Sequence, residues 1–163
     1  MIAILLLGGN LGNRDANLRF ALFQLKKIVG KVLQMSKVYE SVAWGKVADK
    51  PFLNQVIEIK TSLSPQELLE AVLLIEEMAG RKRTLKWSNR TLDIDILYLE
   101  DKIINEPSLK VPHPELQNRA FTLVPLAEIQ ANFVHPILKK TTKEMMINCA
   151  DNECPKEYKK KGV

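Results

Sequence analysis

The sequence has few cysteines and no long apolar run, and each absence argues against a class of protein. Only two cysteines occur in 163 residues, Cys149 and Cys154, without a matching His or Cys cluster. A disulfide scaffold and a four-ligand zinc site are therefore disfavoured, and we expect free thiols in a reducing cytoplasm. The longest apolar run, Met1 to Leu7, covers about a third of a membrane span, so we expect neither an anchor nor a signal peptide.

The composition is that of an ordinary folded protein with a modest basic excess. Hydrophobic residues make up 46% of the chain, and 24 Lys and Arg outnumber 19 Asp and Glu, which leaves a net charge of +5. The length predicts one domain over residues 1–163, with a frayed tail from about residue 151 that lacks a hydrophobic stripe. The charge alone allows nucleic acid, an anionic small molecule, or solubility as its purpose.

The hydrophobic pattern predicts strands and helices in a characteristic order. Strands are expected at residues 1–7, 31–42, 52–63 and 91–99, and helices at 14–29 and 65–79. A short hairpin, a loop and mixed helix should follow to about residue 148. The order strand, helix, strand, strand, helix, strand predicts an α+β fold with a ferredoxin-like split βαβ sheet, two helices packed on one face, and C-terminal additions.

The last of these strands carries two aspartates on one face. Asp93 and Asp95 alternate with Leu92, Ile94 and Ile96, so their α-carbons should lie about 6 to 7 Å apart while the apolar side chains face the core. Two carboxylates that do not complete a cage suit Mg²⁺, which takes its other ligands from water and from nucleotide phosphates. A solvated polar strand face is the alternative.

A cationic segment precedes the aspartates and strengthens this interpretation. It holds five cations and no acid: Arg81, Lys82, Arg83, Lys86 and Arg90. Guanidinium groups orient phosphate oxygens by paired hydrogen bonds, and a triphosphate requires such cations beside its metal ions. Taken alone, the run would be read as a solvated surface. His113 and Arg119, further along, could contact phosphate or base, or be structural.

Several aromatic residues near loops could form a flat slot for a planar heterocycle together with Asn54: Trp44, Phe52, Trp87 and Phe121. Core packing is the ordinary alternative for each of them. The glycine-rich turn at residues 8–13 lacks both the Walker A sequence and the Gly-x-Gly-x-x-Gly spacing, so a tight connection from strand to helix explains it.

Over nearly its whole length the chain resembles the 6-hydroxymethyl-7,8-dihydropterin pyrophosphokinases. The resemblance rests on motifs in fixed order: Leu7-Gly8-Gly9-Asn10-Leu11-Gly12, Tyr39-Glu40-Ser41, Pro51-Phe52-Leu53-Asn54, Gly80-Arg81, Arg90-Thr91-Leu92-Asp93-Ile94-Asp95-Ile96, Pro112-His113-Pro114, Asn118-Arg119-Ala120-Phe121 and Val124-Pro125-Leu126. It implies a ferredoxin-like α+β fold. It also implies transfer of pyrophosphate from ATP to the hydroxymethyl group of the dihydropterin, with release of AMP, in folate biosynthesis.

The resemblance also implies roles for individual residues. Asp93 and Asp95 would bind two Mg²⁺ ions, and Arg81, Arg90 and Asp95 would be catalytic. The implied ATP-binding residues are Glu76, Arg81, Arg83, Trp87, Arg90, Ile96, Lys110, His113 and Arg119. The implied pterin-binding residues are Ser41, Val42, Ala43, Trp44, Phe52, Asn54, Asp93 and Phe121.

Two functions without catalysis remain as alternatives. A ferredoxin-like RNA-binding module would use its sheet face and the basic segment, but it expects aromatic residues at an RNP-type motif, which the sequence lacks. A regulatory small-molecule domain would bind ligand without releasing AMP. For the enzyme we expect a cytoplasmic monomer whose partners are ATP and the pterin, with neither nucleic acid nor membrane.

Overall fold

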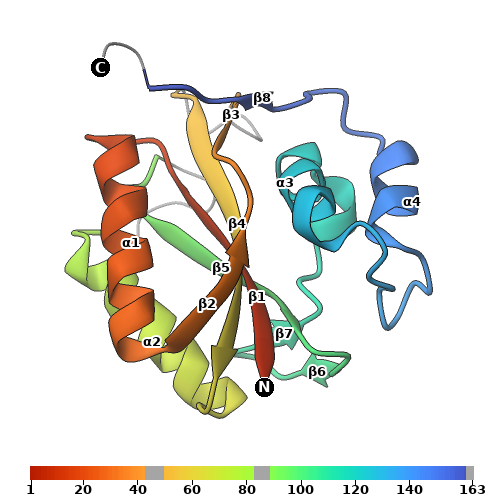
Figure 1. Cartoon of the computed structure of the whole chain (residues 1–163), viewed down its shortest axis with the longest axis horizontal. Coiled ribbons are helices and arrows are strands. Elements are labelled where there is room, and N and C mark those ends of the chain that lie inside the picture. The colour runs from red at the N-terminus through yellow and green to blue at the C-terminus, as the bar shows by residue number, and fades with distance from the viewer. Residues whose placement is uncertain (43–49, 83–88, 161–163) are drawn as a thin grey trace.

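The structure, a computed structural model, describes residues 1–42, 50–82 and 89–160. An antiparallel sheet forms its centre, with one pair of helices on each side (Figure 1). The predicted residues 43, 44, 83 and 87 lie outside the described ranges.

The main sheet has six strands and is built around β1 (Ile2–Gly9). This strand pairs antiparallel with β4 (Phe52–Thr61) on one side and with β5 (Asp93–Leu99) on the other. Both β2 (Gly30–Met35) and β3 (Tyr39–Ser41) pair with β4, and β8 (Lys156–Glu157) pairs with β3. A separate two-stranded sheet joins β6 (Ile104–Asn105) to β7 (Lys110–Val111).

Helices pack on both faces of the sheet. On one face lie α1 (Arg14–Ile28) and α2 (Pro65–Met78), while α3 (Ala120–Gln130) and α4 (Thr142–Ile147) lie across the other, after the short 3₁₀ helix η1 (Leu116–Asn118) (Figure 1). Residues of β1 alternate between the two cores: Leu5 and Leu7 belong to the larger, Ile4 and Leu6 to the smaller. None of the helices in the described ranges is long and apolar enough to cross a bilayer.

The sequence-based element order is confirmed, and one strand differs in an instructive way. The strand expected at residues 31–42 is divided into β2 and β3, which contact different parts of β4. The division falls at Ser36, whose amide donates to the carbonyl of Val56 at 2.8 Å, while the amide of Val56 donates to Ser36 Oγ at 3.0 Å. A side-chain oxygen thus replaces a backbone acceptor and changes the register.

The C-terminal tail also differs from the expectation of a frayed segment. Residues 156 and 157 extend the sheet by pairing with β3, and the Tyr158 amide donates to the carbonyl of Val38 at 2.8 Å. Pro155 is buried. The tail is held by backbone pairing at a sheet edge, which needs no hydrophobic stripe of its own.

The capping box of α2 allows a direct test of local stability. Ser64 Oγ accepts from the amide of Glu67 at 3.2 Å, and the Glu67 carboxylate accepts from the amide of Ser64 at 2.7 Å. We predict that Ser64→Ala lowers the free energy of unfolding by about 1 kcal/mol, as measured by urea denaturation. An unchanged midpoint and slope would contradict this account of the helix start.

Candidate active site

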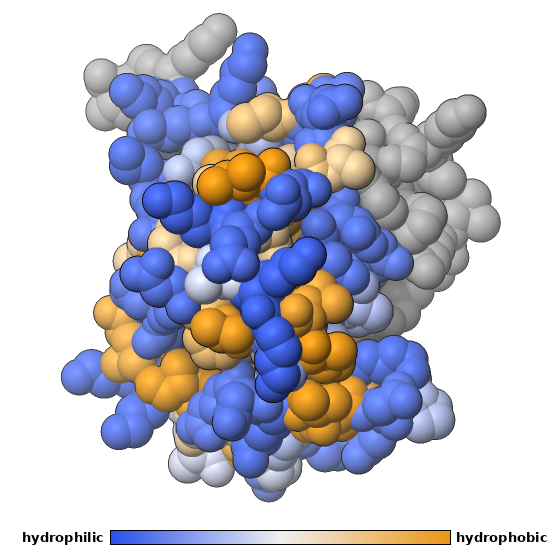
Figure 2. Space-filling view, turned by 90° about the vertical axis from the view of Figure 1, so that its right-hand side faces the viewer, coloured by the Kyte–Doolittle hydropathy of each residue, from blue (hydrophilic) through white to orange (hydrophobic). Residues whose placement is uncertain are grey.

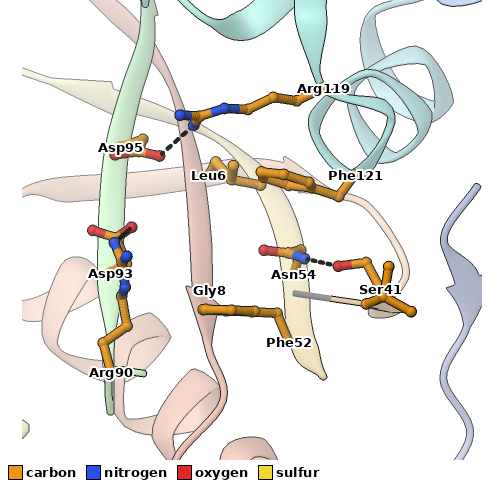
Figure 3. A pocket seen from close by; sticks show the side chains of 11 residues that line it. Leu6, Gly8, Ser41, Phe52, Asn54, Arg90, Asp93, Asp95, Arg119 and Phe121 are labelled. Atoms are coloured by element: carbon orange, nitrogen blue, oxygen red, sulfur yellow. Dashed lines mark hydrogen bonds and ion pairs between the residues drawn. The ribbon is translucent and has the colours of Figure 1, made fainter. Parts of the chain in front are cut away.

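Two pockets meet at the pair of aspartates on β5. The first is lined from β1, β3, β4, β5 and α3 by Leu6, Gly8, Ser41, Val42, Phe52, Asn54, Arg90, Asp93, Asp95, Arg119 and Phe121 (Figure 3). The second includes Val72, Leu73, Glu76, Arg81, Ile94, Ile96, Lys110 and His113, and shares Asp93 and Asp95 with the first. Groups bound in the two pockets would therefore face each other across these carboxylates.

A chain of ion pairs surrounds Asp93. Arg81 Nη1 donates to Asp93 Oδ1 at 2.7 Å, and Arg90 Nη1 donates to Asp93 Oδ2 at 2.8 Å. Arg81 also donates to both oxygens of Glu76, at 2.7 and 2.6 Å. Burial acts to lower the pKa of Arg81, but the charges of Asp93 and Glu76 outweigh it and raise that pKa overall. Glu76 is itself buried on α2, so its carboxylate holds the Arg81 guanidinium in a fixed position.

Asp95 has weaker ionic partners than Asp93. His113 Nε2 and Arg119 Nη1 each lie 3.9 Å from one of its oxygens, beyond hydrogen-bond distance. Burial, followed by the charge of Asp93, raises the pKa of Asp95 from 3.8 to about 8, against the opposing charge of Arg119. Near neutral pH, a further cation beside this carboxyl would therefore favour its ionised form.

The orientation of His113 is set by its own loop. Its amide donates to the carbonyl of Leu97 at 3.0 Å, and its Nδ1 accepts from the amide of Glu115 at 3.1 Å. Because Nδ1 accepts, Nε2 carries the proton of the neutral ring and faces Asp95. The other histidine, His135, accepts two backbone amides in a turn, as expected for a structural residue.

The donor set fits a metal that draws most of its ligands from elsewhere. In the described part of the chain, no three or more His, Cys, Asp or Glu side chains group to hold an ion. Asp93 and Asp95 could supply two hard oxygen ligands, and phosphate oxygens and water would complete the coordination, as Mg²⁺ favours. The raised pKa of Asp95 is consistent with a carboxylate that requires a cation to ionise fully.

The first pocket has the shape of a slot. Figure 3 shows Phe52 and Phe121 on opposite sides of it, with Asn54 between them. Asn54 Nδ2 donates to Ser41 Oγ at 3.1 Å, which leaves the amide oxygen directed into the slot. Each ring is in cation–π contact with an arginine. Arg90 Cζ lies 5.8 Å from the centroid of the Phe52 ring, and Arg119 Cζ lies 5.5 Å from that of the Phe121 ring. Two rings and an amide suit a flat, hydrogen-bonding heterocycle.

Two residues of the glycine-rich turn contribute to the site, which the sequence patterns did not indicate. A Cβ on Gly8 would lie 2.6 Å from Asn54 Oδ1, so the glycine makes room for that amide. Asn10 is buried and donates to the carbonyl of Lys50 and to Asn89 Oδ1, while it accepts from the amide of Arg90. The turn therefore ties the ends of two loops to β1. A signal was present, because the turn is part of the first family motif.

The structure brings together every described residue of the predicted site. Ser41, Val42, Phe52, Asn54 and Phe121 line the first pocket; Glu76, Arg81, Ile96, Lys110 and His113 line the second. Arg90 and Arg119, expected at ATP, line the first pocket beside the shared aspartates instead of the second. Ala43, Trp44, Arg83 and Trp87 lie outside the described residues.

Fold and site together define a class of protein. Paired carboxylates between two pockets, flanked by arginines, are typical of enzymes that transfer phosphoryl groups with the help of Mg²⁺. The sheet order and the two helices on one face are those of the ferredoxin-like α+β fold.

Comparison with known proteins identifies the family within this class. Residues 4–131 match the family model of 7,8-dihydro-6-hydroxymethylpterin-pyrophosphokinase. The curated 2-amino-4-hydroxy-6-hydroxymethyldihydropteridine pyrophosphokinase of Aquifex aeolicus is 45% identical over 138 residues, which cover 85% of this chain and 86% of that protein. The enzyme of the same name from Bacillus subtilis is 43% identical over 129 residues, which cover 78% of this chain and 77% of that protein.

Solved structures support the fold. A Plasmodium falciparum HPPK-DHPS triple mutant with STZ-DHP superposes with a TM-score of 0.74 at 18% identity, over 90% of this chain. The present chain spans only 43% of the length of that protein.

The chain belongs to the 7,8-dihydro-6-hydroxymethylpterin-pyrophosphokinase family. This membership confirms the family, the ferredoxin-like fold and the enzyme class, an ATP-dependent diphosphotransferase, that the sequence predicted. The comparisons give no support to the RNA-binding alternative.

The environment of Asp95 predicts a conflict between stability and function. Its pKa is 3.8 ordinarily and about 8 in the folded chain, so between these values the folded chain holds a proton that the unfolded chain has released. Stability therefore falls as the pH rises through this window. We predict that Asp95→Asn, which cannot ionise, raises the melting temperature relative to the native chain at about pH 9, with the difference shrinking toward about pH 4.

The measurement is thermal unfolding in metal-free buffer containing a chelator, because bound cations would stabilise the native carboxylate. Asp101→Asn, at an exposed aspartate, serves as the matched control and should show no such pH trend. If the melting-temperature difference between Asp95→Asn and the native chain stayed constant with pH, the raised pKa of Asp95 would be contradicted.

Proposed function

We propose that this chain transfers the pyrophosphoryl group of ATP to the hydroxymethyl oxygen of 6-hydroxymethyl-7,8-dihydropterin in folate biosynthesis, with release of AMP. The observation that carries the proposal is the meeting of a flat slot and a second pocket at Asp93 and Asp95. This arrangement suits a reaction between a planar acceptor and a metal-bound polyphosphate. The Aquifex aeolicus relative carries the name of this activity.

The first pocket is assigned to the pterin. Its rings would be sandwiched between Phe52 and Phe121, and the Asn54 amide oxygen would accept hydrogen bonds from the amino group of the heterocycle. Ser41 holds the Asn54 amide in this orientation through its hydroxyl. The hydroxymethyl group would then project toward Asp93 and Asp95, at the end of the slot that borders the second pocket.

The second pocket is assigned to ATP. Its apolar lining, which includes Val72 and Leu73 on α2, would contact the adenine. Ile96, the residue after Asp95, also lines this pocket. Lys110 and His113 line the same pocket and would supply hydrogen-bond donors for phosphate oxygens. The polyphosphate would extend toward the shared aspartates.

Two Mg²⁺ ions are proposed as the metal cofactors, with Asp93 and Asp95 as their protein ligands. When bound, such ions neutralise phosphate charge, polarise the transferred group and lower the pKa of the attacking hydroxyl. In the structure both oxygens of Asp93 accept from arginines. A cation at this carboxylate would compete with the two guanidinium groups and could exchange places with one or both of them.

The exchange gives Arg81 and Arg90 their role. Once Asp93 turns to a cation, both guanidinium groups can donate to phosphate oxygens, and the buried Glu76 still holds Arg81 in place. The hydroxymethyl oxygen attacks the β-phosphorus in line and its proton is released to solvent, the bond from the β-phosphorus to the α,β-bridging oxygen breaks, and AMP leaves with that oxygen. The arginines stabilise the negative charge that develops there.

We further propose that residues 1–163 form one pyrophosphokinase domain that acts as a monomer in the cytoplasm. Both cysteines are free thiols, which suits a reducing compartment. Sedimentation of the purified chain tests the oligomeric state.

The central test is an assay for AMP. With ATP, Mg²⁺ and 6-hydroxymethyl-7,8-dihydropterin, the native chain should form AMP in equal amount to the pterin pyrophosphate. We predict that Asp95→Ala lowers this rate by at least about 1,000-fold, because one of two metal ligands is lost. Its circular dichroism should remain native. Normal turnover by this variant would overturn the assignment of Asp95 as a metal ligand. If the native chain bound the ligands but formed no AMP, a regulatory domain would be favoured.

Gly8 provides a test specific to the pterin pocket. In Gly8→Ala, the new methyl group would approach Asn54 Oδ1 to 2.6 Å and displace the amide. We predict that the KM for the pterin rises about ten-fold while the KM for ATP stays within about two-fold, since one hydrogen-bonding group is misplaced. Steady-state kinetics with each substrate varied in turn measures both. Equal increases in the two values would place Asn54 outside the pterin site.

A further inference from the structure

The C-terminal segment contacts elements on both sides of the first pocket. Residues 151–160, referred to here as the brace, follow α4 and cross one end of the molecule to pair with β3 (Figure 1). They lie beyond residues 4–131, the part that the family model matches. None of the described residues that line either pocket belongs to the brace. Any effect on the substrate must therefore be indirect.

The first contact is at the start of α3. The residue that precedes this helix, Arg119, makes no side-chain capping bond. Instead, Asp151 Oδ2 accepts from the amide of Ala120 at 3.0 Å, while Oδ1 accepts from the amide of Glu153 at 3.0 Å. A carboxylate here satisfies an amide that the helix leaves unpaired and favours the positive end of the helix dipole. Because Ala120 lies between Arg119 and Phe121, Asp151 holds the turn that carries the Phe121 wall.

The second contact is on the opposite wall. The brace pairs with β3 next to Ser41, and the ring of Tyr158 lies under the guanidinium of Arg14, 5.4 Å from its centroid. Arg14 in turn donates to Glu40 Oε2 at 2.7 Å and to the carbonyl of Pro51 at 3.2 Å. These two residues adjoin Ser41 and Phe52. Tyr158 thus supports, through Arg14, the backbone of the Phe52 wall.

The surface on the α3 and α4 side is mixed in hydropathy (Figure 2). Figure 2 shows hydrophobic residues there interrupted by polar ones. The exposed apolar side chains include Val134, Ile137 and Ile147.

We propose that the brace sets the separation of the two pocket walls, with Asp151 and Tyr158 as positioning residues that determine affinity for the pterin. This inference rests on the proposed function of the first pocket. A planar ligand between two rings is sensitive to their spacing, and small misplacements of binding groups are costly. ATP is assigned to the other pocket, which no described residue of the brace lines.

The Asp151 contact is tested by kinetics and by direct binding. Asp151→Ala should raise the KM and the dissociation constant for the pterin roughly five-fold, the factor that one capping interaction is typically worth, with the KM for ATP unchanged. Asp151→Asn retains a side-chain oxygen and should restore most of the affinity. Asn152→Ala, an exposed neighbour, is the matched control and should behave as the native chain. Amide exchange at Ala120 should accelerate only in Asp151→Ala.

The Tyr158 contact is tested by a pair of variants that differ in aromaticity. Tyr158→Phe keeps a ring under Arg14 and should retain native pterin affinity, whereas Tyr158→Leu keeps apolar bulk but loses the cation–π contact. We expect Tyr158→Leu to raise the pterin KM about three-fold. Lys159→Ala, at an exposed position of the same segment, is the control.

The outcomes separate this inference from the proposed function. If the native chain releases no AMP, the proposed function fails, and equilibrium binding of 6-hydroxymethyl-7,8-dihydropterin to the same variants still decides the role of the brace. Native pterin affinity in both Asp151→Ala and Tyr158→Leu would overturn the inference. An equal loss of affinity for ATP, accompanied by a lower melting temperature, would also overturn it, because it would show general destabilisation.

Discussion

The active site depends on one constraint, which is that Asp93 and Asp95 must stand side by side on a strand whose other residues are fixed in the core. Leu92, Ile94 and Ile96 are buried beneath α1 and α2, so the strand cannot rotate without exposing them. Pairing with β1 fixes its register, and Gly8 lies opposite Asp93 in that pairing. Burial of the apolar residues therefore fixes the direction in which Asp93 and Asp95 point, and both pockets are arranged around these two side chains.

The second physical theme is a local balance of charge. Glu76, Asp93 and Asp95 are set against Arg81, Arg90 and Arg119, all within or bordering the same site. Because the contacts with Glu76 can persist, Arg81 is already held in place when a polyphosphate and its cations arrive, whereas the contacts of Arg81 and Arg90 with Asp93 are the ones that would change. The chain's overall charge of +5 is a poor guide to this arrangement, because the relevant cations are balanced by acids of the same site, of which Glu76 is buried.

Features with a short sequence period were predictable, and contacts between distant segments were not. The alternation in residues 92–96 and the capping box at Ser64 follow from local geometry, and the structure has both. Ser36 could not be foreseen, because its hydroxyl replaces a backbone acceptor only once β4 lies beside it. The local sequence indicates only a turn at Gly8. The closeness of Gly8 to Asn54 arises from the pairing of β1 with β4, which joins residues 46 positions apart in the chain. The family motifs include residues of both pockets that the local pattern does not single out, because motifs record such distant contacts without explaining them.

The C-terminal brace shows why the same limit applies beyond the motifs. Its composition is polar and lacks periodicity, so composition alone predicts a frayed end. What orders it is a set of partners supplied by the rest of the fold: an open strand edge at β3, an unpaired amide at the start of α3, and the Arg14 side chain. Each partner belongs to an element that also carries or adjoins a pocket wall. The proposed role of the brace follows from these partners: a segment that touches no substrate would act on the site through the backbone that carries its walls.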